Sequence, residues 1–254
     1  MTSNRKKLIS EMLKGIETGN PSVVAVVNEE KYIQHNPQTQ EGSEGLVALF
    51  KRLSKTSPRV NIVRVFEDGD FVFAHTEYDF SNRNIGFEIF RFEEGKAVEH
   101  WDNIQKRQGP NNAGHSMVDG TIEVSDLEMT ESNRELIQSF VQEVLINGEL
   151  DKIPDYIQQA NFIEHNPRMD TLDELRAILS STINNDSDSI RYKRCHRVLA
   201  DGNFVLSVSE GVFNKTPFTF FDLFRLNEGK IVEHWDTTEA IPPKDKWKNN
   251  NGKF

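Results

Sequence analysis

One block of sequence occurs twice along this chain, and that repetition constrains the fold more than any other feature. The segment 32–37, which contains His-Asn-Pro, recurs at 162–167. Further matches join 68–72 to 201–205, 90–96 to 224–230, and the Glu-His-Trp-Asp at 99–102 to the one at 233–236. The offset grows only from 130 to 134 residues. Such a period is too long for a solenoid unit, so each copy is expected to be a whole domain.

The length of 254 residues suits two domains of ordinary size. The repeat predicts copy one over residues 1–108 and copy two over 130–242. A linker at 109–129 begins with turn-forming and polar residues, and its His115 is expected to be solvated. The locally basic segment 243–254 is expected to be a frayed polar tail.

Each copy shows helical signals first and strand signals afterwards. Apolar residues at helical spacing predict helices over 8–16 and 135–145, a second helix before each His-Asn-Pro, and a third over 43–53 and 172–180. Alternating segments with turn signals between them predict strands over 60–66, 71–80, 86–92 and 96–105, repeated in copy two. Helices followed by a hairpin-linked, antiparallel sheet indicate the α+β class.

Composition narrows the possible environments and partners. The net charge of −10 is spread along the chain, which argues against nucleic acid as a partner. No apolar run is long enough for a membrane helix or an export signal. The single cysteine, Cys195, allows no internal disulfide and no cysteine zinc cluster. We therefore expect a cytoplasmic protein.

The repeated motifs resemble a known family. His-Asn-Pro after a helix, an Asp-Gly-x-Phe hairpin, and a last strand bearing Glu-His-Trp-Asp are similar to SnoaL-like polyketide cyclases, of the nuclear transport factor 2-like superfamily. The resemblance implies a cone-shaped domain in which a curved sheet and about three helices surround an apolar pocket. It implies cofactor-free acid/base chemistry on small carbonyl compounds or epoxides, although other members only bind ligands. It also implies an internal pseudo-dimer of the two copies, or a homo-oligomer.

The last strand of each copy carries the candidate chemistry. Because side chains alternate between faces, His100 and Asp102 share one face in copy one, as His234 and Asp236 do in copy two. A buried carboxylate beside an imidazole suits proton abstraction next to a carbonyl. The resemblance points to Asp102 and Asp236 as the general acid/base.

The preceding strand adds a second carboxylate to each copy, Glu88 or Asp222. A three-residue loop over 93–95 would set Glu88 opposite His100 and on the same face, whereas a two-residue loop would turn it away. We favour the three-residue loop because Gly229 repeats Gly95. Glu88 would then converge with His100 and Asp102, and Asp222 with His234 and Asp236.

Further candidates come from the other strands and the His-Asn-Pro turns. In the strand that begins at Phe71, His75 has no counterpart in copy two, where Val208 takes its place, so His75 is a candidate catalytic residue and copy one holds the fuller polar set. The candidate ligand-binding residues are His35, Phe71, Phe73, Trp101, His165, Phe204, Phe220 and Trp235.

Most of these residues also have a structural interpretation. His35 and His165 can cap backbone groups in a turn that Pro closes, and Trp101 and Trp235 can be core. The spacing of His35, His75, His100, Asp102 and Glu88 does not favour a metal site. The leading hypothesis is an acid/base enzyme acting on a small apolar carbonyl compound. The alternative is a non-catalytic ligand-binding or stress-associated protein.

Overall fold

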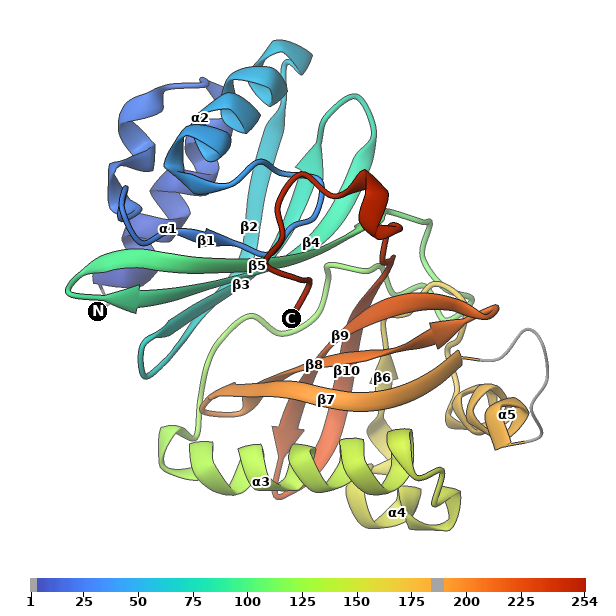
Figure 1. Cartoon of the computed structure of the whole chain (residues 1–254). Coiled ribbons are helices and arrows are strands. Elements are labelled where there is room, and N and C mark those ends of the chain that lie inside the picture. The colour runs from blue at the N-terminus through green and yellow to red at the C-terminus, as the bar shows by residue number, and fades with distance from the viewer. Residues whose placement is uncertain (1–3, 184–189) are drawn as a thin grey trace. The chain divides into compact units, whose positions relative to one another are not determined.

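The computed structural model describes residues 4–183 and 190–254 and divides the chain into two compact domains (Figure 1). The first domain joins the chain up to Arg107 with the segment Pro242–Phe254, and the second is Gln108–Ile241. The first domain therefore includes the segment that follows the last strand of copy two, and the second domain includes the segment that follows the last strand of copy one. None of the described helices is long and apolar enough to cross a membrane.

The first domain is built from two helices and one curved sheet. A 3₁₀ turn, Pro21–Val26, stands where the second helix is predicted before His-Asn-Pro. The strand order is β1-β5-β4-β3-β2, with β1 parallel to β5 and the other pairs antiparallel. The elements are α1 (Asn4–Lys14), β1 (Ile33–Gln34), α2 (Gly42–Leu53), β2 (Arg59–Asp68), β3 (Phe71–Asp79), β4 (Arg83–Glu93) and β5 (Lys96–Lys106).

The second domain repeats this arrangement in the same order. Its sheet runs β6-β10-β9-β8-β7, again with one short parallel strand at the edge. The elements are α3 (Thr130–Phe140), α4 (Ile153–Tyr156), β6 (Ile163–Glu164), α5 (Leu172–Ile183), β7 (Ile190–Asp201), β8 (Phe204–Phe213), β9 (Thr216–Asn227) and β10 (Lys230–Ala240). The predicted α+β class and the tandem repeat are confirmed.

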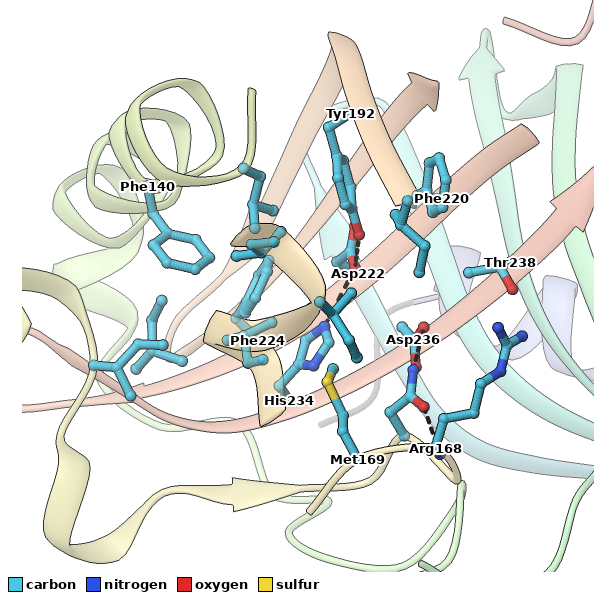
Figure 2. Close-up of a pocket in the computed structure, with 18 of the residues that line it drawn as sticks. Phe140, Arg168, Met169, Tyr192, Phe220, Asp222, Phe224, His234, Asp236 and Thr238 are labelled. Carbon is cyan, nitrogen blue, oxygen red and sulfur yellow. Dashed lines mark hydrogen bonds and ion pairs between the residues drawn. The ribbon is translucent and has the colours of Figure 1, made fainter. Parts of the chain in front are cut away.

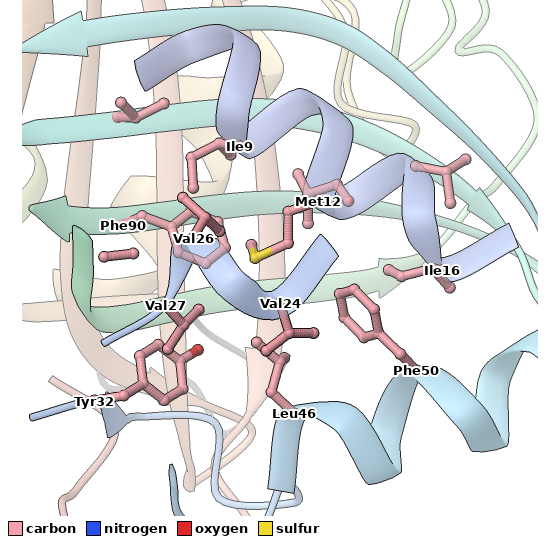
Figure 3. Close-up of a cluster of buried hydrophobic side chains, with 14 of the residues drawn as sticks. Ile9, Met12, Ile16, Val24, Val26, Val27, Tyr32, Leu46, Phe50 and Phe90 are labelled. Atoms are coloured by element: carbon pink, nitrogen blue, oxygen red, sulfur yellow. The ribbon is translucent and has the colours of Figure 1, made fainter. Parts of the chain in front are cut away.

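Helix α1 forms because its apolar residues fall on one stripe that the sheet can cover. Ile9, Met12 and Leu13 are buried, while the basic residues of the same helix face solvent. Figure 3 shows Ile9 and Met12 facing Phe90 of the sheet, with Phe50 of α2 closing the cluster. In the second domain Thr171 caps α5, since the backbone N–H of Glu174 donates to its hydroxyl at 3.2 Å.

The hairpin between β4 and β5 corrects the predicted loop. Glu93 pairs with Lys96, so the loop has two residues, Glu94 and Gly95, and both have positive φ angles of 48° and 79°. A one-residue bulge at Val98 then shifts the register, so that Glu88 lies opposite Asp102. The face expected for Glu88 was right, but a bulge and not a longer loop puts it there.

The C-terminal segment is not the frayed tail that its composition suggests. Asn249 and Lys253 are only 6% and 4% exposed. Asn249 donates from Nδ2 to the carbonyl oxygens of Asn36 and Thr39, at 2.7 and 3.0 Å. The segment closes over the His-Asn-Pro turn of the first domain, because its polar side chains satisfy backbone groups there.

The linker does the same for the second domain. Asn111 donates from Nδ2 to the carbonyl oxygens of Glu164 and Met169, at 2.7 and 3.3 Å. His115, expected to be solvated, is half-buried, and its ring centroid lies 5.3 Å from that of His165. The two segments also share sequence, since 111–114 (Asn-Asn-Ala-Gly) matches 249–252 (Asn-Asn-Asn-Gly).

Candidate functional site

In the first domain the predicted polar side chains meet inside the curved sheet. His100 on β5 forms a hydrogen bond with Glu88 on β4, with 2.7 Å between Nε2 and Oε2. Its other ring nitrogen lies 3.0 Å from Oε1 of Gln34 on β1. Tyr78 on β3 donates its hydroxyl to the second oxygen of Glu88 at 2.7 Å. These residues form one buried chain, which we call relay one: Tyr78, Glu88, His100 and Gln34.

The second domain holds a matching chain, relay two, made of Tyr192, Asp222, His234 and Glu164. Figure 2 shows the first three of these residues. His234 lies between two carboxylates, with Nε2 at 3.3 Å from Asp222 and Nδ1 at 2.9 Å from Glu164. Burial lowers the pKa of His234, but the two carboxylates outweigh it, and the pKa is raised well above its ordinary value. His234 is therefore an imidazolium at neutral pH.

Asp102 lies beside relay one and is fully paired. Asn36 donates from Nδ2 to Oδ2 at 2.6 Å, and Lys253 places Nζ 3.2 Å from Oδ1. Burial alone would raise the pKa of Asp102, but the charges of Lys253 and His100 outweigh it, and the pKa is lowered. Asp102 therefore carries its charge in a buried ion pair.

Asp236 occupies the same position in the second domain, where no lysine of the described residues pairs with it and the nearby cation is Arg168. Asn166 donates from Nδ2 to both carboxylate oxygens at 2.9 Å. Burial raises the pKa of Asp236 to about 7, and the charges of Asp222 and Glu164 add to the rise, whereas the charge of His234 opposes it. Asp236 therefore changes charge near neutral pH, which suits a residue that takes up and returns a proton.

A cavity adjoins the relay in each domain. The first has a volume of about 210 Å³, and Glu88, His100 and Asp102 line it together with apolar residues of α1 and α2. The second has a volume of about 60 Å³, several times the roughly 10–15 Å³ that one water needs. Its lining combines Asp222, His234 and Asp236 with apolar side chains that include Phe140, Met169, Phe220 and Phe224.

Residues 9–100 match the family model of the SnoaL-like domain. The first domain is a SnoaL-like domain. The second domain, which lies outside the matched residues, repeats its strand order, relay and His-Asn-Pro turn, so the chain carries the same α+β fold in tandem. The resemblance seen in the motifs is confirmed.

Two solved structures show the extent of the structural likeness. TsrD from Streptomyces laurentii is 20% identical, with 41% of this chain and 92% of that one covered at a TM-score of 0.36. An LEH-like epoxide hydrolase of M. tuberculosis is 16% identical, with 43% and 84% covered at a TM-score of 0.35. Both alignments span about one domain, and these scores carry no conclusion on activity. A comparison with curated protein sequences found no match.

In both domains the His-Asn-Pro histidines lie away from the cavity. His35 stacks on Trp101 with 4.7 Å between ring centroids, and its nitrogens lie 2.9 Å from Oε1 of Glu99 and 3.0 Å from the carbonyl oxygen of Gly252. His165 repeats the arrangement against Trp235 at 4.6 Å. The structure thus places these four residues where their structural interpretation expects them, in a network that holds the turn.

Other predicted residues also lie outside the cavities. His75 is fully buried, stacks on Phe87 at 4.5 Å and has Nδ1 3.0 Å from a guanidinium nitrogen of Arg64. Its face of β3 is opposite the one that carries Tyr78, because side chains alternate. Phe71, Phe73 and Phe204 do not line either cavity, and Phe220 is the one predicted ligand-binding residue that does.

Several residues of the site were missed from the sequence. Asn36 and Asn166 belong to the His-Asn-Pro motif and could have been weighed as partners of the aspartates. Gln34 and Glu164 precede the motif and differ between the copies. Lys253 follows the repeated Asn-Asn-x-Gly, the one sequence signal for its position, and its contact with Asp102 spans 151 positions, beyond the reach of motif spacing.

Two groups of side chains have the composition and spacing of a metal site. Glu88, His100 and Asp102 offer ligand atoms within 4.8 Å of one another, as do His115, Asp119 and His165. In the first group hydrogen bonds and the Lys253 ion pair already engage these atoms. In the second, His165 Nδ1 lies 2.8 Å from both the Ser116 carbonyl oxygen and Asp119. Hydrogen bonding accounts for both groups.

Proposed function

We propose that the second domain is an acid/base catalyst for small apolar carbonyl compounds, with Asp236 as the residue that moves the proton. The observation that carries this proposal is a buried aspartate with a pKa of about 7 at the wall of an apolar cavity. General acid/base catalysis works best when the pKa of the group lies near the working pH.

The chemistry requires one proton to move twice. The carboxylate of Asp236 takes a proton from the carbon next to the substrate carbonyl, and the bond's electron pair moves onto the carbonyl oxygen as an enolate. Where a β,γ double bond of the substrate makes the enolate a conjugated dienolate, neutral Asp236 then returns the proton to the γ carbon, which moves the double bond into conjugation with the carbonyl and completes an isomerisation. Alternatively, the enolate carbon attacks a second carbonyl of the same molecule and the proton goes to the new alkoxide, which completes an aldol cyclisation.

Two polar groups at the same cavity suit the intermediate. Asn166 hydrogen-bonds Asp236 and fixes its orientation. The exposed side chain of Arg168 lines the cavity, and Figure 2 shows its guanidinium near Thr238, with Cζ 5.2 Å from the Phe213 ring centroid. A cation there would stabilise negative charge on an enolate oxygen.

A proton-exchange assay tests this role without knowledge of the natural substrate. The full chain is incubated in D₂O with 1-indanone or 2-tetralone, and loss of the protons next to the carbonyl is followed by NMR. Asp236→Asn is expected to lower the exchange rate by about 10²–10⁴-fold, because the general base is gone. The double variant Asp102→Asn/Lys253→Met is the matched control in the first domain, because it removes the carboxylate together with its buried counter-charge, and it should leave the rate within about twofold.

The proposal fails if Asp236→Asn exchanges at the wild-type rate. A second candidate function, ligand binding without chemistry, is supported by the hydrogen-bonded state of relay two, in which Tyr192, Asp222, His234 and Glu164 hold one another. That function predicts saturable binding of the same ketones with no exchange above the buffer rate in either variant or wild type.

A further inference from the structure

The two relays differ in buried charge, although their geometry is the same. Relay one ends at Gln34, a neutral amide, whereas relay two ends at Glu164. Glu164 is 1% exposed and accepts hydrogen bonds from the backbone N–H groups of His165 and Asn166 at 2.9 Å, besides the imidazole of His234. All three of these groups donate to the carboxylate, so Glu164 takes the place of the neutral Gln34 amide with an acidic side chain.

Relay two therefore carries two carboxylates, Glu164 and Asp222, for one imidazolium, His234. The remaining ionisable groups at this cavity are Asp236 and Arg168, which balance each other when Asp236 is ionised. One negative charge is left over in a buried place. An uncompensated buried charge is costly, so a cation that enters the cavity would gain from it.

One carboxylate oxygen of Asp222 has no hydrogen-bond donor among the described residues. One of its oxygens, Oδ1, accepts from Tyr192 at 3.0 Å and faces His234 at 3.3 Å. The other, Oδ2, is buried, and no donor among the described residues pairs with it. Asp222 is 2% exposed and lines the cavity. In the first domain both oxygens of Glu88 have partners, Tyr78 and His100.

The first domain shows what an ammonium does at such a site. Lys253 brings a buried ammonium to Asp102, and this cation offsets the carboxylates around relay one. In the second domain the repeated Asn-Asn-x-Gly segment carries His115 at the matching position, and its ring contacts His165 instead of Asp236. Among the described residues, the cation that lines the second cavity is Arg168, an exposed side chain, and no buried ammonium matches that of Lys253.

We infer that the second cavity binds a molecule that carries an ammonium group, a primary or secondary amine on an apolar body, with its N–H donated to Oδ2 of Asp222. This deepens the proposed function, since it rests on the same cavity and names the charge of the substrate. The apolar body would lie among Phe140, Phe220 and Phe224. The ammonium would supply both the charge and the donor that relay two lacks.

A matched series of probes tests the inference by calorimetry on the full chain at pH 7.5. The probes are 2-phenylethylamine, 2-phenylethanol and 3-phenylpropanoate, which share a ring and differ in charge. The amine is expected to bind about tenfold or more tightly than the alcohol, because its hydrogen bond to a carboxylate is charge-assisted. The carboxylate probe is expected to bind most weakly.

Two variants locate the effect. Glu164→Gln gives relay two the residue that relay one already tolerates, and it should reduce the preference for amine over alcohol to about threefold or less, as the extra charge is lost. Asp222→Asn should abolish the preference. Glu128→Gln makes the same change at an exposed position of this domain and should leave all affinities unchanged.

The titrations either support or contradict binding of an ammonium group in the second cavity. Equal affinity for amine and alcohol, tighter binding of 3-phenylpropanoate, or no binding of any probe would overturn the inference. A preference that survives Glu164→Gln would also overturn it. The ketone exchange assay is independent of these titrations. Exchange by the wild type without amine preference would remove only this inference, whereas amine preference without exchange would remove only the proposed catalysis.

Discussion

The two domains place the same polar chain in the same fold and compensate its charge differently. In the first, relay one ends at the neutral amide of Gln34, and Lys253 pairs with Asp102. In the second, Glu164 replaces the amide, and the partner of Asp236 among the described residues is the neutral amide of Asn166. The same fold therefore accommodates this group of buried polar residues in two ways. In the first domain the ammonium of Lys253 pairs with the buried Asp102, whereas in the second a buried carboxylate oxygen of Asp222 lacks a donor among the described residues at an apolar cavity.

The hydroxyl of each relay comes from a different strand. Tyr78 lies on β3 and faces Val60 on β2, whereas in the second domain Tyr192 lies on β7 and faces Gly211 on β8. Each tyrosine still donates to the carboxylate of its relay, at 2.7 and 3.0 Å. The tyrosine thus lies on the third strand of the first repeat but on the edge strand of the second, and its hydrogen bond to the relay carboxylate is present in both.

The largest expected effect is on stability in the first domain. Asp102→Asn leaves Lys253 buried without its carboxylate, and breaking a buried pair costs about 3–5 kcal/mol. We expect this loss in the free energy of unfolding at pH 7, measured by urea denaturation. The double variant Asp102→Asn/Lys253→Met should recover most of it, since no charge is then left unpaired. An unchanged midpoint for Asp102→Asn would break the comparison.

The equivalent change in the second domain is expected to act in the opposite direction. The pKa of Asp236 is raised from 3.8 to about 7, so the folded state binds its proton more tightly than the unfolded state. Its contribution to stability is therefore lost as pH rises through this window, by up to about 4 kcal/mol above pH 7.

Asp236→Asn should remove this penalty. Its gain in unfolding free energy over the wild type should be absent near pH 4, grow towards pH 7 and stay constant above it. Urea denaturation at pH 4, 6 and 8 measures the trend. Destabilisation at pH 8 would show that Asp236 resembles Asp102, and the two domains would then not differ as described.

A smaller effect is expected from the two tyrosines, and it should be alike in both domains. Tyr78→Phe and Tyr192→Phe each remove a hydroxyl from a buried carboxylate, which costs about 1–3 kcal/mol. The midpoints of urea denaturation should fall by similar amounts. A cost for only one of them would show that the two hydrogen bonds are not equivalent.

The smallest predicted effect concerns the two Asn-Asn-x-Gly segments. Asn111→Ala and Asn249→Ala each remove an amide that donates to two carbonyl oxygens of a His-Asn-Pro turn. Each should cost about 0.5–1.5 kcal/mol, the usual net contribution of a neutral hydrogen bond. Thermal melting of both variants measures this. A larger loss for Asn249→Ala is expected if its segment also releases Lys253.

Much of the fold could be predicted, because repeated local patterns determine it. Strand alternation put Glu88, His100 and Asp102 on one face, and the structure brings them together. The one-residue bulge at Val98 could not be predicted, since no residue there has a special backbone preference. It was the bulge, and not the predicted loop length, that kept Glu88 on the face of His100.

The part of the site that was missed depends on contacts distant in sequence. The expectation that copy one holds the fuller polar set rested on His75, which lies on the other face of its sheet. The features that separate the domains are Lys253, whose partner is 151 positions away, and the exchange of Gln34 for Glu164. Neither periodicity nor motif spacing reports which charges become buried together.

The central claim is that Asp102 and Asp236, equivalent in position, differ in protonation. The most direct test is carbon-13 NMR titration of the side-chain carboxyl groups in protein labelled at aspartate, with Asp102→Asn and Asp236→Asn used to assign the two signals. We predict that Asp236 titrates near pH 7, whereas Asp102 stays ionised to below its ordinary range. Titration of both carboxyl groups together at an ordinary value would contradict the claim.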